Sequence, residues 1–139
     1  RVVVASNQSG LSRGLFDDQA LANIHHKFCL MAEEAGGFID GIFFCPHLPE
    51  DNCDCRKPAT GLLAQIEKQF ACSLKGCFLV GDRYTDIQAA LLFGLNPILV
   101  RTGKGLDTEK QLRVESNNSA LIVDNLAMAV TDIILKVHE

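Results

Sequence analysis

The chain has 139 residues, of which 47% are hydrophobic and 22% charged, and this composition suits one globular domain. Its net charge of -4 argues against a broad electrostatic surface for nucleic acid, so we expect no nucleic-acid partner. The sequence contains no long apolar run and no export-signal pattern, so we expect no membrane partner and a cytoplasmic location.

The first predicted element is a short buried strand followed by a polar loop. Val2–Ala5 is a continuous apolar run, typical of a strand in a parallel sheet. In the loop Ser6–Gly10 that follows, hydroxyl, amide and backbone N–H groups can converge on an anion. Such turns are common, so phosphate binding here needs support from other parts of the chain.

A helix and a second strand are predicted next. Asp17 or Asp18 can cap a helix that extends to about Glu34. Phe38–Phe44 is rich in strand-forming residues and leads directly to Cys45. The apolar positions of the helix recur at intervals of three and four residues, at Leu21, Ile24, Phe28 and Met31.

A cluster of metal-binding residue types follows the second strand. Cys45 and His47 are two positions apart, as are Cys53 and Cys55, so each pair projects to one side of an extended chain. Five residues separate the pairs, which allows a tight loop in which four ligands surround a tetrahedral zinc ion. Four protein ligands leave no open position, so this zinc would be structural. The alternatives are two disulfides or a loop without metal.

The rest of the sequence continues to alternate helices and strands, which predicts an α/β fold with a mainly parallel sheet flanked by helices. Arg101–Gly105, between two of these elements, is predicted to be a flexible basic loop. In chain order the predicted elements are a helix from about Thr60, a strand at Cys77–Val80, a helix through Leu92, a strand at Pro97–Val100, a strand at Leu121–Val123 and a closing amphipathic helix from Leu126.

Three loops of complementary chemistry are expected beyond the carboxyl ends of the strands, where ligands bind in such sheets. They are the polar loop Ser6–Gly10, the cations Arg56 and Lys57, and the carboxylates Asp82 and Asp86, which could hold Mg²⁺. Each has an ordinary alternative, since the cations could be solvated and the carboxylates could cap a helix. Together they predict a site for phosphoryl transfer.

Four motifs occur in a characteristic order along the chain. They are Ser6-Asn7-Gln8-Ser9-Gly10, the cluster Cys45, His47, Cys53 and Cys55, the run Arg56-Lys57-Pro58, and Gly81-Asp82-Arg83-x-x-Asp86-Ile-Gln88-Ala89-Ala90. Together they resemble the haloacid dehalogenase (HAD) superfamily and, within it, the zinc-containing D-glycero-D-manno-heptose 1,7-bisphosphate 7-phosphatases. The resemblance implies a HAD-like Rossmannoid fold with a zinc-binding loop. It also implies a monomeric, Mg²⁺-dependent phosphatase that acts on a small phosphosugar during lipopolysaccharide precursor synthesis.

The resemblance assigns roles to these residues. Ser6 would contact the transferring phosphoryl group, and Lys57 would stabilise its charge. Asp82 would bind Mg²⁺, and Asp86 would orient the residues of that site without contacting the ion. The substrate-binding residues would be Asn7, Gln8, Ser9, Arg56 and Arg83, and zinc would be bound by Cys45, His47, Cys53 and Cys55.

The sequence lacks the Asp-x-Asp pair with which HAD phosphatases attack phosphorus and transfer protons. We expect that pair, and the first central strand that carries it, to precede Arg1. Residues 1–139 would then be a single HAD-like domain without its N-terminal strand, inactive and poorly folded alone.

Two alternatives to the heptose enzymes remain open. One is a histidinol-phosphate phosphatase, which shares the zinc cluster and the Arg-Lys-Pro sequence. The other is a catalytically inactive, zinc-stabilised module that binds phosphosugars. Ser9–Gly14 and Leu99–Lys104 resemble the heptose enzymes more closely, and Arg13 with Arg101–Lys104 would favour a bisphosphorylated sugar.

Overall fold

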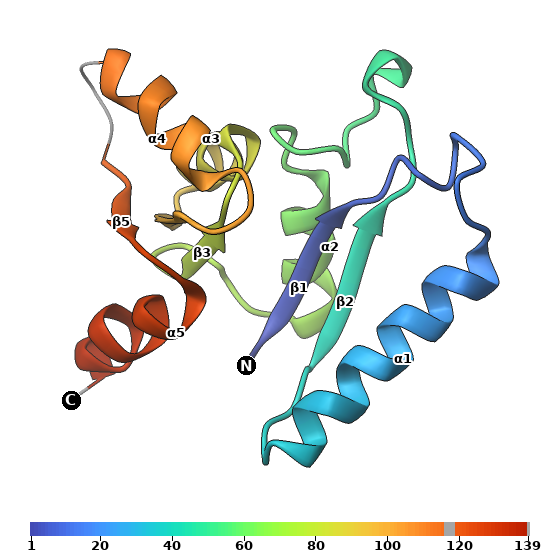
Figure 1. Cartoon of the computed structure of the whole chain (residues 1–139), viewed down its shortest axis with the longest axis horizontal. Helices are drawn as coiled ribbons and strands as arrows, with labels where there is room; N and C mark the ends of the chain where they lie inside the picture. Colours follow the sequence, from blue (N-terminus) through green and yellow to red (C-terminus); the bar gives the residue numbers. More distant parts are fainter. Residues whose placement is uncertain (116–118, 139) are drawn as a thin grey trace. The chain divides into compact units, whose positions relative to one another are not determined.

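Two parallel strands form the centre of the N-terminal unit, Arg1–Phe70 (Figure 1). In the computed structural model, which describes residues 1–115 and 119–138, β1 (Val3–Asn7) pairs with β2 (Gly41–Cys45). The register places Asn7 beside Cys45, and the Gln8 N–H extends the pairing by donating to the Cys45 carbonyl at 2.7 Å. The predicted phosphate loop and the first zinc ligand therefore leave the sheet side by side.

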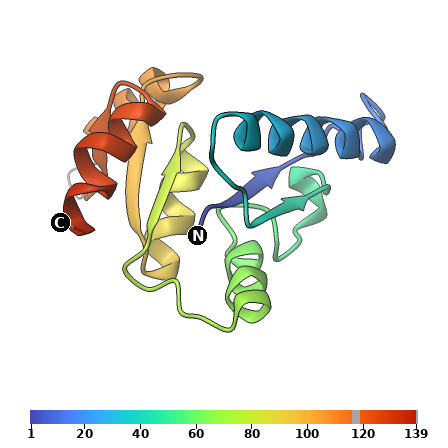
Figure 2. The same ribbon diagram turned by 90° about the horizontal axis from the view of Figure 1, so that it is seen from below.

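Two helices, α1 (Asp18–Glu34) and α2 (Gly61–Phe70), lie on opposite faces of this sheet (Figure 2). The start of α1 is as predicted, because the Asp17 carboxylate accepts the Ala20 N–H at 2.8 Å. Leu62, Leu63 and Ile66 of α2 are buried. The core beside the β2 end combines Leu62 with the thiols Cys45 and Cys55.

The apolar face predicted for α1 is buried at one of its four positions. Leu21 is buried, whereas Ile24, Phe28 and Met31 are 57%, 44% and 58% exposed. The reason is geometric: α1 has 17 residues and each strand has five. A helix of that length extends for about 26 Å, whereas the strands are about 17 Å long, so the two-stranded sheet covers part of one side of α1.

The C-terminal unit, Ala71–Glu139, contains a three-stranded parallel sheet in the order β3-β4-β5. Its strands are β3 (Phe78–Gly81), β4 (Asn96–Val100) and β5 (Leu121–Val123). Neighbouring residues of β4 point to opposite faces: Leu99 packs with α3 (Tyr84–Phe93) and α4 (Gly105–Val114), while Ile98 packs with Ala129 from the closing helical segment. This unit therefore has an apolar layer on each side of its sheet.

The parallel pairing is as predicted, and four local features differ. Strand β1 extends to Asn7, so Ser6 and Asn7 of the predicted loop are its last two residues. Helix α4 was not predicted, because apolar positions are sparse in Gly105–Val114 and its Leu106 is 57% exposed. The closing segment is irregular, passing from α5 (Leu126–Met128) through a π-helical stretch (Ala129–Ile134) to a 3₁₀ turn (Lys136–His138). Strand β2 begins at Gly41 rather than at Phe38. No helix in the described ranges is long and apolar enough to cross a membrane.

Candidate metal centre and phosphate site

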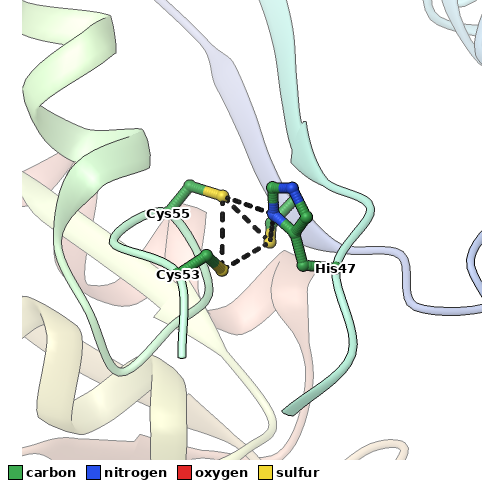
Figure 3. A group of neighbouring side chains, drawn as sticks. His47, Cys53 and Cys55 are labelled. Carbon is green, nitrogen blue, oxygen red and sulfur yellow. Dashed lines mark hydrogen bonds between the residues drawn. The ribbon is translucent and has the colours of Figure 1, made fainter. Parts of the chain in front are cut away.

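Four predicted ligands form one cluster in the N-terminal unit (Figure 3). The three Sγ atoms of Cys45, Cys53 and Cys55 and the Nδ1 atom of His47 all lie within 4.8 Å of one another. Cys55 Sγ lies 3.0 Å from Cys45 Sγ, 3.6 Å from Cys53 Sγ and 3.2 Å from His47 Nδ1. Tetrahedral zinc with bonds of about 2.0 to 2.3 Å needs neighbouring ligand atoms about 3.5 to 3.8 Å apart. The cluster fits a zinc ion after small adjustments.

We call Cys45–Cys55 the zinc clip. Its first ligand is the last residue of β2, and the chain then turns back through a 3₁₀ turn, Pro49–Asp51. The turn is closed by the Asp51 carboxylate, which accepts the Leu48 N–H at 2.8 Å, and by Asn52, which adopts a left-handed φ of 49°. All six cysteines are free thiols, so the structure contains neither of the alternative disulfides.

The thiols of the zinc clip have unequal pKa values. Burial raises the pKa of Cys53, but hydrogen bonds from the Arg56 N–H and from the Cys45 and Cys55 thiols outweigh it and lower the pKa to about 7. Burial and the neighbouring Cys45 and Cys53 thiols raise the pKa of Cys55 to about 12. Cys53 and Cys55 therefore do not both form thiolates near neutral pH without a compensating cation. A divalent zinc ion supplies that charge.

Lys57 and Asn7 join the zinc clip to the polar loop after β1. The Asn7 side chain donates to the Lys57 carbonyl at 3.0 Å and accepts the Lys57 N–H at 3.1 Å. Lys57 is 8% exposed, and its Nζ donates to the Ala5 carbonyl at 2.6 Å. A cation is therefore held at the carboxyl end of β1, where the sequence predicts the phosphate site.

The other predicted residues of this unit lie around the same strand ends. Gln8 Nε2 donates to Ser6 Oγ at 2.7 Å, and the Arg56 guanidinium donates to the His47 carbonyl at 3.3 Å. The Ser9 carbonyl accepts the Arg13 N–H at 3.0 Å. The structure therefore connects Ser6 to Gln8 and Arg56 to the zinc clip, while the contacts of these residues with substrate remain predictions.

In the C-terminal unit, the predicted carboxylates follow β3. Asp82 Oδ2 accepts the Lys104 N–H at 2.8 Å. Asp86 is 6% exposed, and its carboxylate accepts the Arg83 N–H at 3.1 Å, so it caps α3. One of the two carboxylates thus has the structural role that the sequence left open, and Asp82 remains the metal-ligand candidate.

Sequence reasoning missed the surroundings of Asp82. A pocket of about 220 Å³ lies between the starts of α3 and α4. Arg101, which the sequence placed in a substrate loop, instead pairs with Glu109 at 2.8 Å and Asp124 at 2.6 Å. The pocket is lined by Arg83, Tyr84, Thr85, Lys104, Asp107, Thr108 and Gln111. Several of these side chains belong to α4, and its polar sequence gave no apolar pattern from which the helix could be predicted.

Comparisons with known proteins agree with this arrangement. The HAD-hydrolase-like family model matches residues 54–129. A D-glycero-beta-D-manno-heptose-1,7-bisphosphate 7-phosphatase from Pseudomonas putida is 40% identical over 96% of this chain and 74% of its own length. The enzyme of the same name from Bordetella bronchiseptica is 47% identical over 79% of this chain and 62% of its own length.

A solved structure gives the same result. The crystal structure of the D,D-heptose 1,7-bisphosphate phosphatase from B. bronchiseptica, complexed with magnesium and phosphate, has a TM-score of 0.89 and 42% identity. The match covers 97% of this chain and 74% of that chain. The resemblance inferred from the motifs is therefore confirmed: the chain belongs to the D-glycero-beta-D-manno-heptose-1,7-bisphosphate 7-phosphatase family of HAD-like hydrolases.

Proposed function

We propose that the protein is a Mg²⁺-dependent phosphatase that removes the 7-phosphate from D-glycero-D-manno-heptose 1,7-bisphosphate and leaves heptose 1-phosphate. The observation that carries the proposal is the match to the magnesium and phosphate complex over 97% of the chain. A cytoplasmic location and a monomeric state belong to the same proposal. They stay predictions.

Lys57 is proposed to neutralise charge on the phosphoryl group. Its ammonium group is largely buried and is held by the Ala5 carbonyl, so it is already in place before substrate arrives. A preorganised cation stabilises developing charge without reorganising solvent, and its effect is stronger away from water. Ser6, one residue beyond Ala5, is proposed to donate its hydroxyl to the same phosphoryl group.

Asp82 is proposed to hold Mg²⁺, and its surroundings fit that ion. Mg²⁺ binds through one or two carboxylates and keeps waters and phosphate oxygens as its other ligands. Oδ2 of Asp82 is fixed by the Lys104 N–H, and Oδ1 has no hydrogen-bond partner within the described residues. Mg²⁺, when bound, offsets negative charge on the phosphoryl oxygens.

The pocket beside Asp82 supports a substrate with more than one anionic group. Arg83 and Lys104 line it, and neither side chain forms an ion pair in the parts of the chain that the structure describes. The acidic residue of the lining, Asp107, lies 3.5 Å from Lys110. Unpaired cations beside neutral donors suit a phosphate group. We propose that this pocket contributes to recognition of a bisphosphorylated sugar.

Several details of the proposal rest on the family resemblance alone. The covalent step through an aspartyl-phosphate requires an Asp-x-Asp pair, and the 139 residues contain none. The single-domain organisation and the substrate-binding roles of Asn7, Gln8, Ser9 and Arg56 also stay predictions. What this chain supplies by its own residues is charge neutralisation, metal binding and substrate orientation.

The test compares two substrates with protein expressed from its complete coding sequence. In Mg²⁺, kcat/KM for heptose 1,7-bisphosphate should exceed that for histidinol phosphate by about 100-fold or more, because a site built for polar groups rejects a substrate that lacks them. The measurement is release of inorganic phosphate. Equal or reversed preference would replace the proposal with the histidinol-phosphate alternative.

A variant of the same experiment tests the pocket. Lys104→Ala should raise KM for the bisphosphate about tenfold, the equivalent of one charge-assisted hydrogen bond of about 1.4 kcal/mol. Lys75→Ala is the matched control, since Lys75 is exposed in the same unit and lies outside the pocket lining. If the two substitutions raised KM equally, the pocket would have no part in recognition of the bisphosphate.

A further inference from the structure

The carboxylate of Asp82 is held by a backbone N–H that lies 22 residues further along the chain. Asp82 follows β3, and the donor to its Oδ2 is the backbone N–H of Lys104, in the turn after β4. Neighbouring parallel strands end at the same edge of a sheet, which is why the two loops meet. A backbone donor has a fixed direction, so it fixes the carboxylate more firmly than a flexible side chain does.

Gly103 makes this close approach possible. Its φ of +62° lies in the left-handed region, which disfavours residues with a side chain. A Cβ at this position would also lie 2.3 Å from Asp82 Oδ2, closer than any non-bonded contact allows. On the other side of Lys104, a Cβ on Gly105 would meet the Val100 carbonyl at 1.8 Å. The turn is therefore fitted between the end of β4 and the Asp82 carboxylate.

A second contact fixes the main chain of Asp82. The Thr108 hydroxyl donates to the Asp82 carbonyl at 2.8 Å, and Thr108 is 6% exposed. Thr108 lies in the first turn of α4, where its own N–H donates to the Lys104 carbonyl at 3.1 Å. The turn and the helix start therefore hold both the backbone and the side chain of Asp82.

These contacts leave the carboxylate suited to a metal. Oδ2 is occupied by one neutral N–H donor, Oδ1 has no hydrogen-bond partner, and no Lys or Arg forms an ion pair with Asp82 within the described residues. A carboxylate that is fixed in direction but not neutralised favours a cation. Groups that orient a metal ligand in this way typically change metal affinity by about 10- to 100-fold when they are removed.

We propose that Gly103, the Lys104 backbone and Thr108 are positioning residues that hold Asp82 in the orientation in which it binds Mg²⁺. This inference rests on the proposed function, because Asp82 is the metal ligand there. Gly103, the Lys104 backbone N–H and the Thr108 hydroxyl act on Mg²⁺ through Asp82, although Lys104 and Thr108 also line the pocket. Their substitution should therefore change Mg²⁺ affinity more than it changes substrate KM at saturating Mg²⁺.

The experiment measures Mg²⁺ binding directly, by calorimetric titration of the protein expressed from its complete coding sequence. Gly103→Ala should weaken Mg²⁺ binding by about tenfold or more. Gly76→Ala is the matched control: Gly76 has a φ of +80° and nothing within 4 Å of its added Cβ, so it carries the same backbone strain without touching Asp82. Gly76→Ala should bind Mg²⁺ as the wild type does.

A second pair of variants decides the question if Gly103→Ala does not fold. Thr108→Val removes the hydroxyl at nearly constant volume and should weaken Mg²⁺ binding, whereas Thr108→Ser keeps the donor and should restore it. Wild-type affinity in both Gly103→Ala and Thr108→Val, or equal loss in Thr108→Val and Thr108→Ser, would overturn the inference. A wild-type protein that binds no Mg²⁺ would instead overturn the proposed function.

Discussion

The zinc clip and the three-stranded sheet obtain their order in different ways. The clip, Cys45–Cys55, has eleven residues, and apart from its cysteines and prolines its apolar side chains are limited to Leu48. The sheet contains Ile98 and Leu99, both fully buried, with apolar layers on both faces. Burial of apolar surface can stabilise the sheet, whereas we expect the clip to need ligand bonds to zinc as well.

This difference extends to the residues proposed for catalysis. Lys57 follows the last zinc ligand by two residues, and its backbone is held by Asn7. Asp82 follows β3 and is held by the turn after β4. The residues proposed for catalysis in the two units therefore depend on two kinds of stabilisation, metal binding for Lys57 and hydrophobic burial for Asp82. Perturbing each region separately should separate their effects.

The largest effect is expected in the zinc clip. Cys53→Ser removes one of four ligands, and structural zinc sites contribute about 10 to 16 kcal/mol of apparent binding free energy. We expect loss of stoichiometric zinc, loss of amide protection from Cys45 to Lys57, and a fall in kcat of about 100-fold as Lys57 loses its fixed position. The measurements are metal analysis, hydrogen exchange and phosphate release.

The control for this substitution is Cys29→Ser. Cys29 is half-buried like Cys53 and lies in the same unit, but it is not part of the ligand cluster. It should retain zinc and activity. A zinc-free Cys53→Ser protein with full activity and normal protection would show that the clip is ordered without metal.

The next effect is expected in the sheet. Ile98 of β4 is fully buried against the closing helical segment. Ile98→Ala should therefore lower the free energy of unfolding by about 2 to 5 kcal/mol through lost burial and a residual cavity. Zinc content should remain unchanged. Leu92→Ala, at a position 72% exposed, is the control and should cost far less. Release of zinc by Ile98→Ala would contradict the view that the zinc clip and the sheet are stabilised separately.

Sequence patterns predicted the parts of the fold in which local chemistry decides the structure. Cysteine and histidine spacing predicted the zinc clip, and apolar runs predicted β3 and β4 to within one residue at each end. Helix α4 could not be found in this way because it is held by polar contacts, such as the Arg113 to Glu109 pair, more than by an apolar stripe. Similarly, periodicity alone did not show which part of α1 would be buried.

For the candidate site, the sequence pointed to candidate ligands but not to the groups that contact them. Asp82 was predicted from its position after a strand, whereas Gly103 and Thr108 contact it from a distant part of the chain. Such contacts depend on which strands are neighbours, and a single sequence does not give strand order. Arg101 shows the reverse error, since a cation near a predicted loop formed ion pairs within the fold.

The smallest predicted effect concerns those ion pairs. Glu109 accepts from Arg101 at 2.8 Å and from Arg113 at 2.6 Å, and hydrogen bonds from these guanidinium groups lower its pKa from 4.5 to about 2. A lowered pKa in the folded state means that the carboxylate stabilises the fold fully above pH 4.5, and that this contribution is lost as the pH falls from 4.5 towards 2.

Glu109→Gln should therefore have a lower Tm than the wild type at pH 7, and the difference should shrink as the pH falls below about 4.5. Acid also releases zinc by protonating its ligands, but that loss is common to both proteins and cancels in the difference. Glu33→Gln, at an exposed position without an ion pair in the described residues, should show no pH-dependent difference. If the Glu109→Gln difference stayed constant down to pH 3, its cause would be packing of the side chain rather than its charge. The stability of the C-terminal unit would then depend on packing even at the contact of Glu109 with Arg101 and Arg113.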